Sequence, residues 1–219
     1  PLGQIRSDGR DNIISSLLIA ASGQVHEVCI YFNGVLLRGN RSTKRSSDQF
    51  EAFESPNDAP LAHAGIQIEY KKRVLRPASE EAFHFQPFKE LPIGVIKIFP
   101  GIQFDYFASL MTDKLKGVVL ETFGAGNIPG SAQNALLPII ERAYQNGTII
   151  TVCSQCSQGA VSLGTYAASS ALRRVGAVNG RDMTTEAALA KSYYLMSISD
   201  DMAFVKSQMQ KSLRGELTE

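Results

Sequence analysis

Short apolar runs alternate with amphipathic segments through the second half of the chain. Runs rich in β-branched residues predict strands over residues 94–99, 117–123 and 148–153. Apolar residues spaced three and four apart predict helices over residues 104–115, 132–147, 160–176, 184–196 and 202–213, with Gly147 and Gly176 closing two of them. Strands that alternate with helices require right-handed crossovers, so the pattern predicts a parallel sheet covered by helices on both faces.

The first part of the chain carries a helical segment followed by a hairpin signal. Residues 11–21 have apolar residues at helical spacing, and Asp11 is the expected N-cap. Asn33 and Gly34 stand between two runs of β-branched and aromatic residues, which predicts a tight β-hairpin.

Three further stretches lack a regular period. The polar residues 40–47 are expected to form a loop, and residues 48–60 a helical turn that their prolines interrupt. Residues 71–92 are charged, proline-bearing and irregular, so we expect a linker between two domains there.

Composition excludes several classes of partner. The 219 residues include 22 basic and 21 acidic side chains, a net charge of +1 that favours neither nucleic acid nor an anionic membrane. The apolar runs are too short to span a bilayer, and the first residues do not resemble a secretory signal. Three cysteines fit a reducing compartment better than a disulfide framework, so we expect a cytoplasmic protein.

The glycine-rich stretch Gly124–Gly130 lies between a predicted strand and a predicted helix. Glycines there allow a ligand to approach the backbone, and a helix N-terminus favours an anion. The spacing differs from a dinucleotide fingerprint, so a tight turn explains it better than phosphate binding. Asn127 is the exception, because its amide could hold a carboxylate or an amide group.

The remaining candidate chemistry is sparse. Cys153 and Cys156 form a CxxC pair without a second pair or clustered histidines, so structural thiols are a better explanation than a zinc or redox site. The three histidines, His26, His63 and His84, share no motif, so we expect no metal and no cofactor.

Two charged residues have both a structural and a functional interpretation. Lys44 fits a solvated loop, although a partly buried lysine can hold a carboxylate ionised and orient a proton relay. Glu186 fits the start of a helix, where the dipole stabilises a carboxylate, although it could also face the ammonium group of a ligand.

Eight segments, in this order and spacing, resemble the bacterial type I L-asparaginases over essentially the whole chain. They are PLGQIRSDGRDN, YFNGVLLRGNRSTK, FESPN, PIGVIKIFPG, VVLETFGAGNIP, SQCSQGAV, DMTTEAALAK and LRGELT. The resemblance implies hydrolysis of L-asparagine to L-aspartate and ammonia without a cofactor. In that family a threonine hydroxyl attacks the amide carbon and forms an acyl-enzyme, and a second threonine, an aspartate and a lysine form a proton relay.

By this resemblance, the relay lysine is Lys44, whereas both catalytic threonines and the relay aspartate belong to family segments upstream of Pro1. Asn127 and Glu186 match substrate-binding residues that reach the active site of a neighbouring subunit, which implies a dimer or tetramer. Thr43 and Cys156 match a regulatory asparagine site of some members. Where some members have a basic residue for that effector, this chain has Glu121, which argues against asparagine activation.

The family fold implied by the resemblance is α/β, with two domains of mostly parallel sheets flanked by helices. Residues 1–88 would be the C-terminal part of the first domain, incomplete in this chain, and residues 89–219 the second domain. Ser169 stands where the family usually has glycine. Two alternatives remain open: an asparaginase-like protein that releases ammonia for tRNA-dependent amidation, and a non-catalytic half that binds amino acids.

Overall fold

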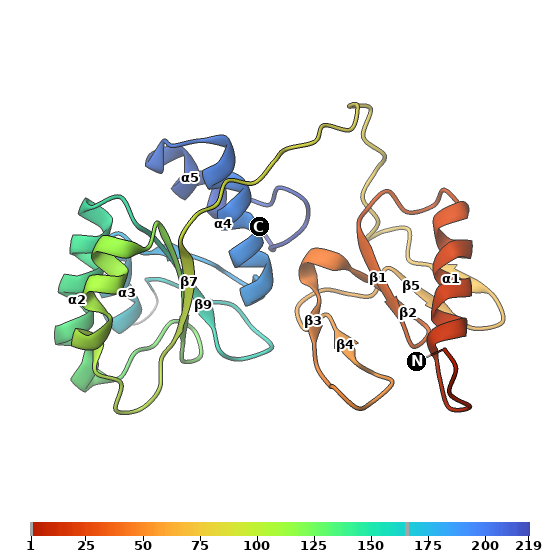
Figure 1. Ribbon diagram of the computed structural model, residues 1–219, viewed down its shortest axis with the longest axis horizontal. Coiled ribbons are helices and arrows are strands. Elements are labelled where there is room, and N and C mark those ends of the chain that lie inside the picture. Colours follow the sequence, from red (N-terminus) through yellow and green to blue (C-terminus); the bar gives the residue numbers. More distant parts are fainter. Residues whose placement is uncertain (1, 165–166) are drawn as a thin grey trace. The chain divides into compact units, whose positions relative to one another are not determined.

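The computed structural model describes residues 2–164 and 167–219, and the chain divides into two compact units, Pro1–His84 and Phe85–Glu219. Figure 1 shows one helix beside a small sheet in the first unit, and a second sheet between helices in the other. Residues 71–92, expected to be a linker, contain neither helix nor strand.

The first unit is built on an antiparallel sheet of order β1-β2-β5-β6, so the expectation of a parallel sheet does not hold for this part. Its elements are α1 (Gly9–Ala21), β1 (Cys29–Phe32), β2 (Val35–Arg38), the 3₁₀ turn Gly39–Arg41, β3 (Thr43–Lys44), β4 (Phe53–Glu54), β5 (Ala62–Ala64) and β6 (Ile68–Tyr70). Ile19 of α1 packs with Leu36 and Leu61, which joins the helix to the sheet.

The predicted hairpin is confirmed. β1 and β2 pair antiparallel, with Phe32 opposite Val35, and the turn residues Asn33 and Gly34 have φ values of 48° and 78°. Positive φ at both turn positions gives a turn whose twist matches that of the strands, and asparagine and glycine adopt that conformation most readily.

The predicted helix is also confirmed, but its N-cap is not. The helix begins two residues earlier, with Asp8 at the cap position and Asp11 in the first turn. The Asp8 carboxylate makes no bond to the helix backbone and instead accepts the Asn12 side-chain amide at 2.8 Å. The side-chain contact between Asp8 and Asn12 therefore marks the start of this helix.

Tertiary contacts overturn two local expectations. Residues 40–47 are not simply a loop, since Thr43 and Lys44 form β3, and residues 48–60 contain β4 rather than a helical turn. The ring of Phe53 packs edge-on against Phe32, with centroids 5.3 Å apart, and the Lys44 ammonium lies 4.8 Å from the centre of the Phe53 ring. These contacts hold Phe53 in an extended conformation that its own sequence does not predict.

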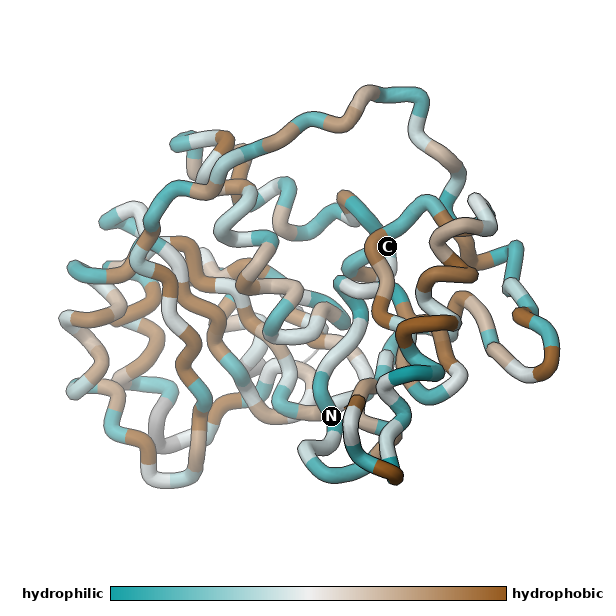
Figure 2. The backbone as a smooth tube through the Cα atoms, turned by 45° about the vertical axis from the view of Figure 1, so that its right-hand side comes forward, coloured by the Kyte–Doolittle hydropathy of each residue, from teal (hydrophilic) through white to brown (hydrophobic). Residues whose placement is uncertain are grey.

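The second unit contains the predicted parallel sheet, with strand order β10-β9-β8-β7. Its strands are β7 (Ile93–Lys97), β8 (Gly117–Thr122), β9 (Ile149–Ser154) and β10 (Val178–Asn179), and its α-helices are α2 (Gly130–Gln145), α3 (Ala167–Arg174), α4 (Thr185–Ile198) and α5 (Met202–Met209). Figure 2 shows apolar residues along much of the sheet and its helices.

Alternate residues of the central strands serve two separate cores. Leu120 and Ile150 pack with Leu136 of α2 on one face, while Val119 and Ile149 share the other core with Leu195 of α4. Each fully buried aliphatic side chain contributes about 1.5–3 kcal/mol. The expectation of an α/β fold with helices on both faces of a parallel sheet is therefore confirmed for this unit.

Some helix predictions were wrong in type or length. The expected helix at 104–115 consists of a 3₁₀ turn, Phe104–Phe107, and a π turn, Leu110–Lys114. There the Thr112 hydroxyl donates to the carbonyl of Ala108, a competing bond that disturbs a regular helix.

Two other helices are shorter than expected. Residues 160–164 are not helical, because Val161 and Ser162 donate their amides to Arg181 and Ala125, and α3 is described from Ala167. The part of that prediction at residues 165–166 lies outside the described residues. α5 ends at Met209 instead of residue 213.

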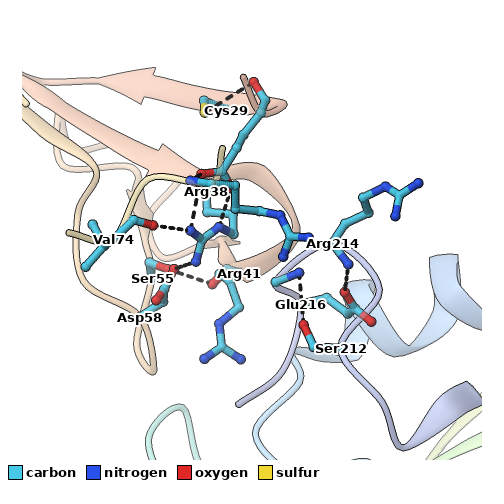
Figure 3. A network of polar contacts seen from close by, with 12 residues as sticks. Cys29, Arg38, Arg41, Ser55, Asp58, Val74, Ser212, Arg214 and Glu216 are labelled. Atoms are coloured by element: carbon cyan, nitrogen blue, oxygen red, sulfur yellow. Dashed lines mark hydrogen bonds and ion pairs between the residues drawn. The ribbon is translucent and has the colours of Figure 1, made fainter. Parts of the chain in front are cut away.

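The chain after α5 is held by a buried ion pair. Lys191 of α4 and Glu216 lie 2.6 Å apart with side chains 4% and 6% exposed, and Lys191 also donates to the carbonyls of Met209 and Lys211. Burial alone would raise the pKa of Glu216, but Lys191 and the amides of residues 213 and 214 lower it on balance. Figure 3 shows the Arg214 amide at the Glu216 carboxylate.

We predict that Lys191→Met lowers the free energy of unfolding by about 3–5 kcal/mol at pH 7, because it leaves Glu216 charged and buried. Adding Glu216→Leu should recover much of that loss, as measured by urea unfolding. The lowered pKa of Glu216 means that the contribution of the pair is present above about pH 4.5 and is lost as the pH falls through the folded-state pKa. Equal losses in the single and double variants would contradict this account.

A second prediction concerns Gly180, where an added Cβ would lie 2.5 Å from the carbonyl oxygen of Val152. Gly180→Ala should cost about 1–3 kcal/mol in thermal or urea unfolding, because backbone on both sides must move. Gly130→Ala is the matched control, since nothing lies within 4 Å of its Cβ and alanine favours the helix. Equal stability of the two variants would refute the tight approach at Gly180.

Candidate functional site

In the second unit, chemically useful groups gather at the carboxyl edge of the parallel sheet. Parallel pairing brings the last residues of neighbouring strands together, with Lys97 opposite Glu121 and Glu121 opposite Cys153. Open parallel sheets bind their ligands at this edge, outside the ends of the strands. A site in this unit is therefore expected here.

Glu121, at the end of β8, connects this edge to α4. The Thr185 hydroxyl donates to Glu121 at 2.6 Å, and the Lys97 ammonium lies 3.9 Å from the other carboxylate oxygen. The Thr184 hydroxyl caps α4 by accepting the Ala187 amide at 3.1 Å. The sheet thus fixes the direction in which α4 begins.

Glu186 follows Thr185 in the first turn of α4, and its side chain is exposed. A carboxylate in this turn is stabilised by the helix dipole, which agrees with the structural interpretation. Its exposure also leaves it accessible to a ligand or to another subunit. Thr185 and Thr184, which sequence reasoning did not assign a role, position it.

The loop after β8 folds back on itself. The amides of Gly126 and Asn127 both donate to the carbonyl of Phe123, and Phe123 donates to the carbonyl of Asn127. Gly126 has φ of 112° and its Cβ would meet Val161 and Leu163 at 3.3 Å, so glycine is required there. With these amides bonded inside the loop, a tight turn accounts for the segment better than a phosphate cradle.

Asn127 is exposed on this loop, whereas the next residue, Ile128, is buried in the core. The buried side chain fixes the loop, and the asparagine amide is left at the surface. Ser169 is fully buried, and a Cβ added at Gly126 would lie 3.4 Å from the Cβ of Ser169. The serine therefore fits against the glycine of the turn.

Gln155 is a structural residue of this edge that sequence reasoning missed. Its side-chain amide donates to the carbonyls of Ile98 and Glu121 at 2.6 and 2.9 Å, and its backbone amide donates to the carbonyl of Thr122. These bonds satisfy backbone carbonyls at the ends of β7 and β8. Its place two residues past a predicted strand was the available signal.

The two cysteines of the CxxC pair lie in different environments. Cys153 is fully buried, and burial, with a smaller contribution from Glu121, raises the pKa of its thiol to about 12. Cys156 is exposed, and its amide donates to the Ser154 hydroxyl. Across residues 2–164 and 167–219, no group of three or more histidine, cysteine, aspartate or glutamate side chains could hold a metal ion. His26, His63 and His84 are all exposed.

Thr43 and Lys44 belong to the first unit, on β3. The Lys44 side chain is exposed and lies over the ring of Phe53. Thr43 is opposite Glu54 in the same two-stranded ladder. Asn127, Cys156 and the start of α4 with Glu186 therefore share the carboxyl edge of the second unit, while these two residues lie in the other unit.

An arginine network that sequence reasoning also missed supports the strands next to Lys44. Arg38 is 8% exposed, forms ion pairs with Glu27 and Asp58, and donates to the carbonyl of Val74 (Figure 3). Burial opposes the charge on Glu27, but Arg38 and the Arg76 amide outweigh it and lower the pKa of Glu27. No sequence motif marks this network, because its members are far apart in the chain.

Two family models match the chain in order. The Asparaginase, N-terminal model covers residues 1–76 and the Glutaminase/Asparaginase C-terminal domain model covers residues 92–209. The chain belongs to the asparaginase family.

Individual proteins match all or nearly all of the chain. L-asparaginase 1 of Escherichia coli K12 is 39% identical over 218 residues, covering 100% of this chain and 64% of that protein. The crystal structure of L-asparaginase I from Vibrio cholerae superposes with a TM-score of 0.92 at 40% identity, covering 100% of this chain and 66% of that one. A glutamyl-tRNA(Gln) amidotransferase component of Pyrococcus abyssi is 29% identical, covering 97% of this chain and 49% of that protein.

This chain thus spans less than two thirds of the length of these asparaginases. Among the residues that the structure describes, no helix is long and apolar enough to cross a membrane.

We predict that Cys156 is the fast-reacting thiol of the native chain. It is exposed, whereas the raised pKa values of Cys29 and Cys153, about 11 and 12, suppress their thiolates. Alkylation at pH 7.5 followed by peptide mass spectrometry should label Cys156 first, and denaturant should make all three equivalent. Fast labelling of Cys153 in the folded chain would contradict the buried position of that thiol.

Proposed function

We propose that the protein containing this chain hydrolyses L-asparagine to L-aspartate and ammonia, in the cytoplasm and without a cofactor. The observation that carries the proposal is the match of both asparaginase domain models in order, together with 39% identity to an L-asparaginase along the whole chain. Residues 1–88 would then be the C-terminal part of the first domain, and residues 89–219 the second domain.

In this proposal the nucleophile is a threonine supplied by a segment that relatives carry beyond the part matched here. Thr122 is a poor substitute, because it is fully buried and its hydroxyl donates to the carbonyl of Cys153. Lys44 would hold the relay aspartate ionised and help the second threonine to exchange its proton. Its exposed side chain is accessible to such a carboxylate.

Asn127 and Glu186 would contribute to substrate binding in the active site of a neighbouring subunit, in a dimer or tetramer. Both side chains are exposed at the carboxyl edge of the sheet, on a glycine-fixed turn and on a capped helix start. The Glu186 carboxylate matches the charge of the α-ammonium group of the substrate. Completion across an interface makes an isolated protomer inactive.

Thr43 and Cys156 would be candidates for a regulatory amino-acid site. Glu121 argues against binding of an effector carboxylate beside it, because two negative charges repel each other. Its own carboxylate is already bound by Thr185 and Lys97. We therefore propose that asparagine activation is weak or absent.

A role in tRNA-dependent amidation is a weaker alternative. The archaeal amidotransferase component is 29% identical and this chain covers 49% of it, compared with 39% and 64% for the bacterial asparaginase. For the asparaginase role, neither a membrane nor a nucleic acid is an expected partner, since the net charge of +1 offers no electrostatic driving force for them.

We predict that Lys44→Met in the complete protein lowers kcat for L-asparagine by about 10²–10⁴-fold, the usual contribution of a proton-transfer group. Ammonia release in a coupled assay measures the effect. Lys72→Met is the matched control, since this lysine is also exposed in the first unit but has no assigned role. Near-parental turnover by the Lys44 variant would exclude it from the relay.

The 219-residue chain by itself should release no ammonia from asparagine, because neither family threonine motif occurs in it. If the purified chain does hydrolyse asparagine and loses that activity on Lys44→Met, the nucleophile must lie within residues 1–219.

A further inference from the structure

The backbone that leads into α4 crosses the end of β9 in a strained conformation. The Gly180 amide donates to the carbonyl of Val152 at 2.9 Å, and any side chain at Gly180 would collide with that carbonyl. The next residue, Arg181, has φ of 54°, a left-handed conformation that costs a non-glycine residue free energy. Such a conformation persists only where surrounding contacts determine it.

Contacts hold Arg181 from three directions. Its amide donates to the Asn179 side chain at 2.8 Å, its carbonyl accepts the Val161 amide at 2.8 Å, and its guanidinium donates to the carbonyl of Thr218 at 3.0 Å. The first partner, Asn179, ends β10, and the second, Val161, lies between β9 and α3. The third comes from the end of the chain.

Thr218 bonds the neighbouring residue as well. Its amide and its hydroxyl donate to the two carboxylate oxygens of Asp182 at 2.8 and 2.6 Å. The last residues of the chain therefore make three hydrogen bonds to two consecutive loop residues. Thr218 is exposed, so these bonds are not a consequence of core packing.

The C-terminal tail, residues 211–219, is itself anchored against α4. Lys191 of α4 binds Glu216 and the carbonyl of Lys211, and Leu217, next to Thr218, is buried in the same core as Leu195. α4 thus carries the anchor for the tail, and the tail binds the loop that precedes α4. The two loop residues that the tail binds, Arg181 and Asp182, lie three and two residues before Thr184, the N-cap of the helix that carries Glu186.

We propose that the C-terminal tail is a clamp that positions the first turn of α4, with Thr218 and Asp182 as positioning residues for Glu186. This inference rests on the proposed asparaginase function for the role of Glu186, while the clamp itself rests on the contacts alone. Release of Thr218 would let the strained residue Arg181 relax and would loosen the turn that holds Thr185 against Glu121.

Hydrogen exchange tests the clamp independently of activity. We expect Thr218→Val, and more strongly Asp182→Ala, which removes the acceptor of two of the three bonds, to raise amide exchange in peptides covering residues 180–190 of the complete protein by roughly tenfold. Thr218→Ser should restore protection, because it keeps the hydroxyl. Ser199→Ala is the matched control, since it removes an exposed side-chain bond, to the Asp201 amide, at the other end of α4.

Kinetics then tests whether the clamp serves Glu186. Thr218→Val should raise KM for asparagine about threefold to tenfold with kcat within twofold, because loosening removes a binding contact rather than a proton-transfer group. Thr218→Ser should return KM to the parental value, and Ser199→Ala should leave it unchanged.

The outcomes separate the two claims. Unchanged exchange at residues 180–190 in both Thr218→Val and Asp182→Ala would overturn the clamp. Raised exchange with unchanged KM, in a protein whose KM does rise on Glu186→Gln, would overturn its role in positioning Glu186. If Glu186→Gln itself leaves KM unchanged, the assignment of Glu186 in the proposed function fails, and the exchange data still decide the clamp.

Discussion

The approach of Gly180 to the carboxyl end of β9 is the constraint on which the candidate site of the second unit depends. The backbone can cross there only because Gly180 has no side chain, and it then turns through the left-handed residue Arg181 into α4. That turn sets where Thr185 meets Glu121 and where Glu186 emerges. A larger residue at Gly180 would displace the start of the helix without touching any functional group.

In both units, buried charged side chains hold irregular segments of the chain in place. Lys191 and Glu216 hold the C-terminal tail, and Arg38 holds Glu27, Asp58 and the chain at Val74. Each charge is expensive to bury, and that cost is offset only while its partners remain in place. Such networks add less to net stability than apolar packing does, but they define which irregular segments lie beside which helices and strands.

Sequence periodicity was reliable where one element buries its own apolar residues. The strands at residues 94–99, 117–123 and 148–153, the hairpin at Asn33 and Gly34, and the helices α2 and α4 follow from local pattern. Prediction failed at β3 and β4, whose two-residue ladder depends on Phe53 meeting Phe32 from far along the chain. It failed again at Leu110–Lys114, where a threonine hydroxyl competes for a helix carbonyl.

The sequence by itself determined the α/β class of the second unit, its parallel sheet, and the family to which the chain belongs, because these depend on short-range periodicity and on motifs in a fixed order. It also named Asn127, Cys156 and Glu186. Tertiary structure alone decided that these three lie at one edge of the sheet and that Glu121 and Thr218 act on the start of α4. The Thr218–Asp182 contact joins residues that are 36 positions apart in the sequence, and the Thr185–Glu121 contact joins residues that are 64 positions apart. At such separations the local sequence pattern carries no information about which residues lie close together.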